Sequence, residues 1–78
     1  MYYVYLLKLA NGKIYTGSTD DLDARELRHH QGKVLATRDL RPLKLIWHCV
    51  FKTRTEARRF EKYLKTGSGQ AFRNKRLI

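Results

Sequence analysis

The chain has 78 residues, 42% of them hydrophobic and 31% charged, and 17 lysines and arginines against 7 acids give a formal net charge of +10. This length leaves room for one domain, so we expect residues 1–78 to form a single domain around a small core. The positive charge favours a polyanionic partner, chiefly nucleic acid and less readily an acidic membrane surface. Solubility alone, or packing against RNA, would be the less specific explanations.

The composition also argues against several other classes of protein. Cys49 is the single cysteine, so no intrachain disulfide can form, and one cysteine with three histidines at these spacings offers no zinc cluster. No apolar run approaches the roughly 20 residues of a membrane span. Because no cationic start with an apolar signal core is found either, we expect a protein of the reducing cytoplasm without a membrane partner.

The first predicted elements are two strands joined by a turn. Residues 2–9 are rich in aromatic and aliphatic side chains, and residues 13–18 predict the returning strand. A two-residue turn would place Tyr5 and Tyr15 on opposite faces of the sheet. A three-residue loop with Gly12 in the left-handed conformation would place both on one face. A site that uses both phenols therefore requires the longer loop.

The remaining elements follow from capping signals, glycines and apolar runs. A helix opened by Thr19-Asp20-Asp21 ends near His30, and a basic loop follows over residues 33–42. Residues 43–51 predict a strand that is apolar enough to be covered on both faces. A second helix runs from the capping box Thr53-x-x-Glu56 to about Lys65, and a short basic helix to Lys75 follows a break at Gly67-Ser68-Gly69. The pattern predicts an α+β fold, with a small three-stranded, mostly antiparallel sheet flanked by helices.

Four residue types in this pattern could carry chemistry. Arg25 and His29 are four residues apart and project from the same side of the first helix, where an exposed polar face is the commoner outcome. Tyr5 and Tyr15 are, taken singly, more often core aromatics than catalytic groups. Glu61 borders the apolar stripe of the second helix, whereas the other acids sit at helix starts or in the basic loop. Glu61 is either a functional carboxylate or the salt-bridge partner of Lys65 one turn later.

Taken together and in order, these residues resemble the GIY-YIG nuclease superfamily. Tyr3-Val4-Tyr5 stands for the first tyrosine motif and Tyr15-Thr16-Gly17 for the second; Arg25 and His29 follow on the next helix, and Glu61 on a later one. The resemblance spans essentially the whole chain and is closest to the small single-domain bacterial members, which are similar to the N-terminal nuclease domain of the excision-repair protein UvrC. Tyr3 replaces the glycine of the first motif.

The resemblance implies a metal-dependent endonuclease that hydrolyses phosphodiester bonds in DNA of particular shape, in repair or recombination. Glu61 would hold a single Mg²⁺ or Mn²⁺ ion, because a two-metal site needs more carboxylates than the chain can supply. Arg25 would stabilise charge on the phosphate, Tyr15 would act as base or orient it, Tyr5 would position water or phosphate, and His29 would contact phosphate or carry a proton.

Basic residues outside these motifs are candidates for binding the nucleic-acid backbone, and contacts of this kind position a duplex without reading its sequence. They are Lys13, Arg58, Arg59, Lys62, Arg73, Lys75 and Arg76. The alternative to an enzyme is a non-catalytic basic nucleic-acid-binding module on the same fold, in which Arg25 and Glu61 are salt-bridged.

Overall fold

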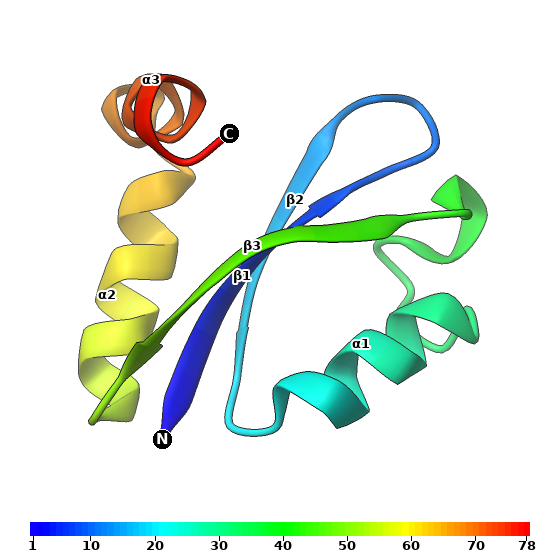
Figure 1. Ribbon diagram of the computed structural model, residues 1–78, viewed down its shortest axis with the longest axis horizontal. Coiled ribbons are helices and arrows are strands. Elements are labelled where there is room, and N and C mark those ends of the chain that lie inside the picture. Colours follow the sequence, from blue (N-terminus) through cyan, green and yellow to red (C-terminus); the bar gives the residue numbers. More distant parts are fainter.

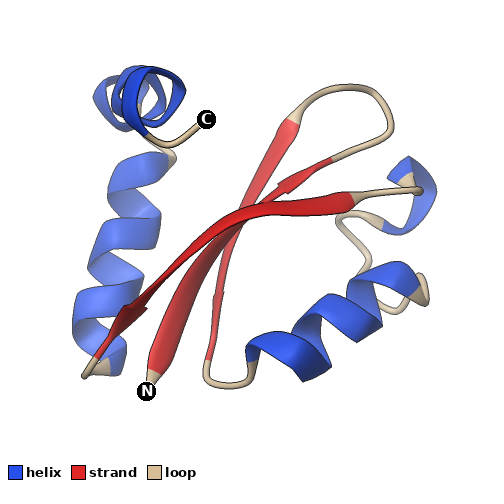
Figure 2. Ribbon diagram, in the orientation of Figure 1, coloured by secondary structure: helices blue, strands red, loops and turns tan.

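The computed structural model describes residues 1–78 and consists of a three-stranded sheet with three helices (Figure 2). The elements are β1 (Tyr2–Lys8), β2 (Ile14–Thr19), α1 (Leu22–His30), the 3₁₀ turn η1 (Arg38–Leu40), β3 (Lys44–Phe51), α2 (Arg54–Leu64) and α3 (Gly67–Arg76). The strands lie in the order β2-β1-β3, and both neighbouring pairs are antiparallel. The predicted α+β class and element order are therefore confirmed. None of the helices combines the length and apolar character needed to cross a bilayer.

The hairpin of β1 and β2 has the register that a shared phenol site requires. Tyr5 lies opposite Gly17, which is the pairing expected for a three-residue loop over residues 10–12. Gly12 has a φ of 83°, in the left-handed region that glycine adopts without a Cβ clash. Because side chains alternate along a strand, Tyr5 and Tyr15 point to the same face of the sheet.

The central strand β1 separates two apolar clusters. Residues 4–7 are buried, and their side chains alternate between the face covered by α2, here called the α2 face, and the face on which α1 lies, the α1 face (Figure 1). On the α2 face, the buried members are Val4, Leu6, Ala57 and Leu64. On the α1 face, they are Tyr5, Leu7, Leu9 and Leu43. Each face of so small a sheet therefore has its own thin core.

The prediction that residues 43–51 would be covered on both faces is wrong. β3 is an edge strand, and along it His48 and Val50 are exposed, the latter at 47%. The sheet order places β1 rather than β3 in the middle, and α1 extends over only part of the α1 face (Figure 1). An apolar run therefore signalled a strand correctly but not its depth in the sheet.

Side-chain caps begin the first two helices where the sequence predicts. Asp21 accepts a hydrogen bond from the N–H of Ala24 at 3.1 Å at the start of α1. Thr53 accepts one from the N–H of Glu56 at 3.2 Å at the start of α2. Such caps satisfy N–H groups that have no partner inside the helix, and they fix the direction in which α1 and α2 leave the sheet.

The predicted break at residues 67–69 is instead the first turn of α3. Thr66 caps this helix by accepting a hydrogen bond from the N–H of Gly69 at 3.0 Å. A Cβ on Gly69 would collide with the carbonyl oxygen of Tyr63 at the end of α2. The glycine therefore permits two helices to approach closely, and it does not end a helix.

Candidate active site

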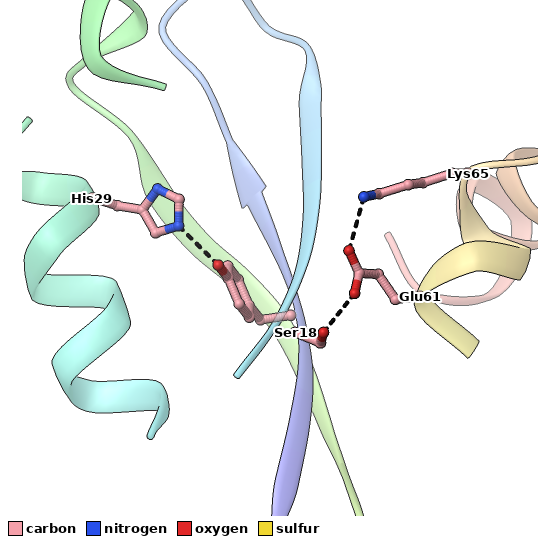
Figure 3. Close-up of polar contacts among 5 residues, drawn as sticks. Ser18, His29, Glu61 and Lys65 are labelled. Carbon is pink, nitrogen blue, oxygen red and sulfur yellow. Dashed lines mark hydrogen bonds and ion pairs between the residues drawn. The ribbon is translucent and has the colours of Figure 1, made fainter. Parts of the chain in front are cut away.

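Two tyrosines and a histidine meet beside β2. The Tyr5 hydroxyl lies 2.8 Å from Nε2 of His29, and both side chains are buried. The ring centroid of Tyr15 lies 6.3 Å from that of Tyr5 and 5.2 Å from that of His29. β1, β2 and α1 each supply one member, as the shared-face register requires. His29 points from α1 toward the sheet (Figure 3).

Gly17 leaves the space that the Tyr5 ring occupies. A Cβ added to Gly17 would lie 2.5 Å from the Tyr5 hydroxyl oxygen, far inside van der Waals contact. The pairing of β1 with β2 runs without a register shift through this point. A glycine inside a strand can mark either a bulge or a close approach of another group, and Gly17 marks a close approach.

Thr37 is a member of this cluster that sequence reasoning missed. Its hydroxyl oxygen lies 2.8 Å from Nδ1 of His29, and both residues are fully buried. Thr37 lies in the basic loop after α1, where nothing in the pattern of neighbouring residues distinguishes it. The imidazole of His29 is thus held at both ring nitrogens, by Tyr5 on one side and by Thr37 on the other.

Burial and neighbouring charges set the protonation of the cluster. Burial raises the pKa of Tyr5 well above its ordinary value, and Tyr15 adds to the rise, while the Arg25 guanidinium opposes it. Burial also lowers the pKa of His29, with the charges of Arg25 and His30 acting in the same direction. At neutral pH the Tyr5 phenol is therefore protonated and the His29 imidazole is neutral.

Arg25 lies between the phenol–imidazole cluster and a pocket at the end of β2. It is half-buried on α1, one turn before His29, and it lines a pocket of about 160 Å³ together with Ser18 and Arg58. The pocket is bounded by the end of β2 and by residues of α1 and α2. The predicted common side of Arg25 and His29 is confirmed, since Arg25 acts on the pKa of both Tyr5 and His29.

Glu61 approaches β2 from the opposite face of the sheet. Its Oε1 accepts a hydrogen bond from the Ser18 hydroxyl at 2.5 Å, and its Oε2 lies 2.8 Å from the Lys65 ammonium (Figure 3). The side chain of Glu61 is 20% exposed, whereas that of Lys65 is 55% exposed. The salt bridge to Lys65 is therefore present, and Ser18 is a second partner that sequence reasoning did not identify.

Glu61 and Tyr5 are close enough to interact across the edge strand β2. The charge of Glu61 contributes to the raised pKa of Tyr5, although Glu61 and Tyr5 stand on opposite faces. β2 has no neighbour on its outer side, so nothing separates the groups there except one strand. Figure 3 shows His29 on one side of this strand and Glu61 on the other.

Of the remaining basic candidates, three line a pocket and four do not. Arg58 lines the pocket beside Arg25, while Lys13 and Arg73 line a second cleft of about 480 Å³ between the hairpin loop and α3. The others are exposed and lie outside both pockets: Arg59, Lys62, Lys75 and Arg76. The structure thus places cations at both ends of β2, with Tyr15 and Glu61 between them.

Comparison with known proteins assigns this arrangement to a class. The family model of the GIY-YIG catalytic domain matches residues 1–76. The chain therefore belongs to the GIY-YIG family, which indicates a nuclease-type hydrolase with a nucleic-acid substrate.

Its relatives include UPF0213 proteins of bacteria. The UPF0213 protein of Bacillus pumilus is 42% identical over 66 residues, covering 83% of this chain and 67% of the relative. That of Staphylococcus saprophyticus is 34% identical over 70 residues, covering 88% and 85%. The solution NMR structure of a UPF0213 protein from Bacillus halodurans is also similar, with a TM-score of 0.57 and 34% identity over 92% of this chain and 81% of that chain.

Proposed function

We propose that this protein is a metal-dependent DNA endonuclease that cleaves phosphodiester bonds at nicks, flaps or branches, in DNA repair or recombination. The observation that carries the proposal is the convergence at one edge strand of a phenol–imidazole cluster, a half-buried guanidinium and a carboxylate. Hydrolysis of a phosphodiester needs a positioned water, a group that takes its proton and stabilisation of negative charge on the phosphate. The edge of β2 offers side chains for each task.

Arg25 is the residue suited to the phosphate. A guanidinium presents several N–H donors in a plane and stays charged at any working pH. Arg25 is directed into the pocket beside Ser18 and is half-buried, so its interaction with a phosphate is less screened than that of an exposed arginine. It would stabilise the charge that develops on the scissile phosphate.

Tyr15 rather than Tyr5 is the candidate base or base-orienting group. The raised pKa of Tyr5 keeps its phenol protonated, which suits a hydrogen-bond donor that positions water or phosphate. Tyr15 is only half-buried and faces the same cluster. His29 lies fully buried behind Tyr5, which favours the role of proton carrier over direct contact with phosphate.

Glu61 is the residue that would hold the metal ion. No three histidine, cysteine or acidic side chains converge in the fold, so water and substrate phosphates would complete the coordination of a metal ion on Glu61. Mg²⁺ commonly binds through one or two carboxylates, several waters and substrate phosphates, and a single carboxylate beside the Ser18 hydroxyl fits that donor set. When bound, Mg²⁺ or Mn²⁺ would offset negative charge on the phosphate. Lys65 would then exchange its contact with Glu61 for one with solvent or substrate.

The basic residues at the two ends of β2 would bind the DNA backbone. Arg58 stands beside the pocket of Arg25, and Lys13 and Arg73 stand at the far cleft. A module of this size buries roughly 600–1,000 Å² on DNA, too little for extended sequence recognition. Selection by DNA shape is therefore the better proposal, with the exposed cations adding to the electrostatic attraction.

The two contacts of Glu61 favour the alternative of a non-catalytic binding module. Glu61 is paired with Lys65 and bonded to Ser18, which is the partnership expected of a carboxylate with a structural role. The net charge of +10 would serve binding equally well without cleavage. The two functions share the fold and differ in what Glu61 does when DNA and a divalent ion are present.

A cleavage assay separates these functions. Labelled DNAs that are intact, nicked, flapped or branched, and a matched RNA, are incubated with the protein in Mg²⁺, in Mn²⁺ or in EDTA. We expect cleavage of at least one of the interrupted or branched DNAs in either metal and none in EDTA. Binding of the same DNAs without cleavage in any metal would contradict the proposal and support the binding module.

A further inference from the structure

The loop between α1 and β3 reaches back into the active-site cluster through one residue. Thr37 is fully buried in this loop, and its hydroxyl oxygen lies 2.8 Å from Nδ1 of His29. On the other side of the ring, Nε2 lies 2.8 Å from the Tyr5 hydroxyl. A neutral imidazole has one N–H, and the partner of one ring nitrogen decides the state of the other. Thr37 is therefore placed to control what Nε2 can do.

The neighbours of Tyr5 indicate where the proton lies. Arg25 acts on the Tyr5 phenol from the pocket side, and a guanidinium has donors only. It therefore faces the lone pairs of the phenol oxygen, and the phenol proton points away from it, toward Nε2 of His29. Nε2 of His29 is the acceptor that lies within reach of the Tyr5 hydroxyl, at 2.8 Å. Since Nε2 then accepts, the ring proton lies on Nδ1 and is donated to the Thr37 hydroxyl oxygen.

The loop holds Thr37 in place by bonds of its own. The N–H of Thr37 donates to the carbonyl of Val34 at 3.1 Å, and its carbonyl accepts from the N–H of Leu40 at 3.0 Å. Arg41 folds back on the end of α1 and donates to the carbonyl of His30 at 3.1 Å. These hydrogen bonds hold the loop in one conformation and keep the Thr37 hydroxyl beside His29.

We propose that Thr37 is a positioning residue that holds His29 as the Nδ1-protonated tautomer, so that Nε2 is the acceptor for the Tyr5 proton. The tautomer is a property of the folded chain and does not depend on any activity. The effect on cleavage rests on the proposed nuclease function. These two consequences can be measured separately.

Three substitutions at Thr37 separate the effect of its hydroxyl from the effect of its side-chain packing. Thr37→Val keeps the side-chain volume and removes the hydroxyl. Thr37→Ser keeps the hydroxyl and removes a buried methyl group, so it lowers stability without removing the acceptor. Thr37→Ala provides a second hydroxyl-free chain if the valine variant does not fold.

The first measurement is the tautomer of His29 from long-range ¹H–¹⁵N NMR correlations at pH 7.5. We expect the wild type and Thr37→Ser to carry the proton on Nδ1, and Thr37→Val or Thr37→Ala to populate both tautomers. A wild type protonated at Nε2 would overturn the inference. So would a valine or alanine variant that keeps the wild-type tautomer, or a serine variant that loses it as fully as they do.

The second measurement is cleavage of a DNA that the wild type cuts. Loss of a group that orients a functional histidine commonly costs about 10- to 100-fold, so we expect Thr37→Val to lower kcat by about tenfold or more with KM unchanged, and Thr37→Ser to stay within about twofold of the wild type. Equal rates for the valine variant and the wild type would overturn the catalytic role of Thr37. A wild type that cuts no DNA would instead contradict the proposed function, while the NMR result still decides the tautomer.

Discussion

The two sides of β2 differ in how tightly they hold their functional groups. On the α1 side, Tyr5 and His29 are buried and bonded to each other, and Thr37 secures the outer nitrogen of the ring. On the α2 side, Glu61 is held by an exposed lysine and by a strand serine at the rim of a pocket. One side is pre-organised, and the other has partners that a substrate or an ion can replace.

This difference indicates a separate role for each side of β2. A buried network with every hydrogen bond made resists rearrangement, because breaking one bond leaves an unpaired polar group. An exposed ion pair contributes little and is easily exchanged. In the proposed nuclease, the α1 side would position the nucleophile, and the α2 side, with Arg25 at its edge, would receive phosphate and metal.

Arg25 connects the two sides and gives the largest expected effect. Replacing it with alanine removes donors aimed at the developing charge, a loss that commonly costs about 10² to 10³ in rate. We expect cleavage by Arg25→Ala to fall by that amount in a single-turnover assay. Arg28→Ala, an exposed arginine on the same helix, is the matched control. Equal losses in both variants would show that Arg25 contributes only general positive charge.

Gly17 tests the pre-organised side. A Cβ there would lie 2.5 Å from the Tyr5 hydroxyl, so Gly17→Ala should displace the phenol from His29. Misplacement of a catalytic group by about 1 Å can cost 10²-fold, and we expect a loss of about 10- to 100-fold in kcat. Gly67→Ala is the control, because a Cβ at that helical position meets nothing within 4 Å. Wild-type kcat in Gly17→Ala would remove Tyr5 from the proposed site.

Arg58 and Arg59 test the receiving side through binding alone. They are neighbours on α2, but about 100° of helix rotation separates them, and Arg58 lines the pocket of Arg25 whereas Arg59 does not. We expect Arg58→Ala to weaken binding to unrelated DNA sequences and to reduce the salt slope by about 1, as for the loss of one phosphate contact. Arg59→Ala should change both less. Fluorescence anisotropy over a salt series measures the DNA affinity and the salt slope of each variant. Equal affinity and equal slope in the two variants would mean that α2 contributes only diffuse positive charge.

His29 gives the smallest effect, on stability. Its pKa is lowered in the folded chain, so below the ordinary histidine pKa of about 6.5 the unfolded chain binds the proton more readily. The free energy of unfolding should therefore decrease as the pH falls from 7.5 to 5.5. Denaturant titrations should show a smaller decrease in His29→Gln and a wild-type decrease in His48→Gln, an exposed histidine. A full decrease in His29→Gln would show that another group is responsible.

Local features of the fold could be predicted from the sequence because their causes lie within a few residues. The caps at Asp21 and Thr53 set the helix starts, whereas the sequence left two hairpin registers open and the left-handed Gly12 of the structure selects one of them. The depth of β3 could not be predicted, because it depends on which strand becomes central. The role of Gly69 was misjudged for the same reason, since the Tyr63 carbonyl that it accommodates belongs to another helix.

In the candidate site too, features caused within one element could be predicted, and features that depend on packing between elements could not. Helical spacing placed Arg25 and His29 on one side, whereas strand alternation placed Tyr5 with Tyr15 only if the hairpin had a three-residue loop. Thr37 and Ser18 were missed, because their partners are 8 and 43 residues away and a hydroxyl carries no signal of its own in a loop or a strand. Glu61 was identified as unusual by its position beside the apolar stripe, but its bond to Ser18 depends on how α2 packs against β2.

The most direct test of the central claim is metal-dependent cleavage by Glu61→Gln. Glutamine keeps the size of the side chain and a hydrogen bond to Ser18, but it removes the charge that would hold a divalent ion. Glu56→Gln, in the cap of the same helix, is the matched control. We predict that Glu61→Gln binds the cleaved DNA as the wild type does but loses cleavage in Mg²⁺ and Mn²⁺, while Glu56→Gln still cuts. Cleavage by Glu61→Gln at the wild-type rate would contradict the proposed site.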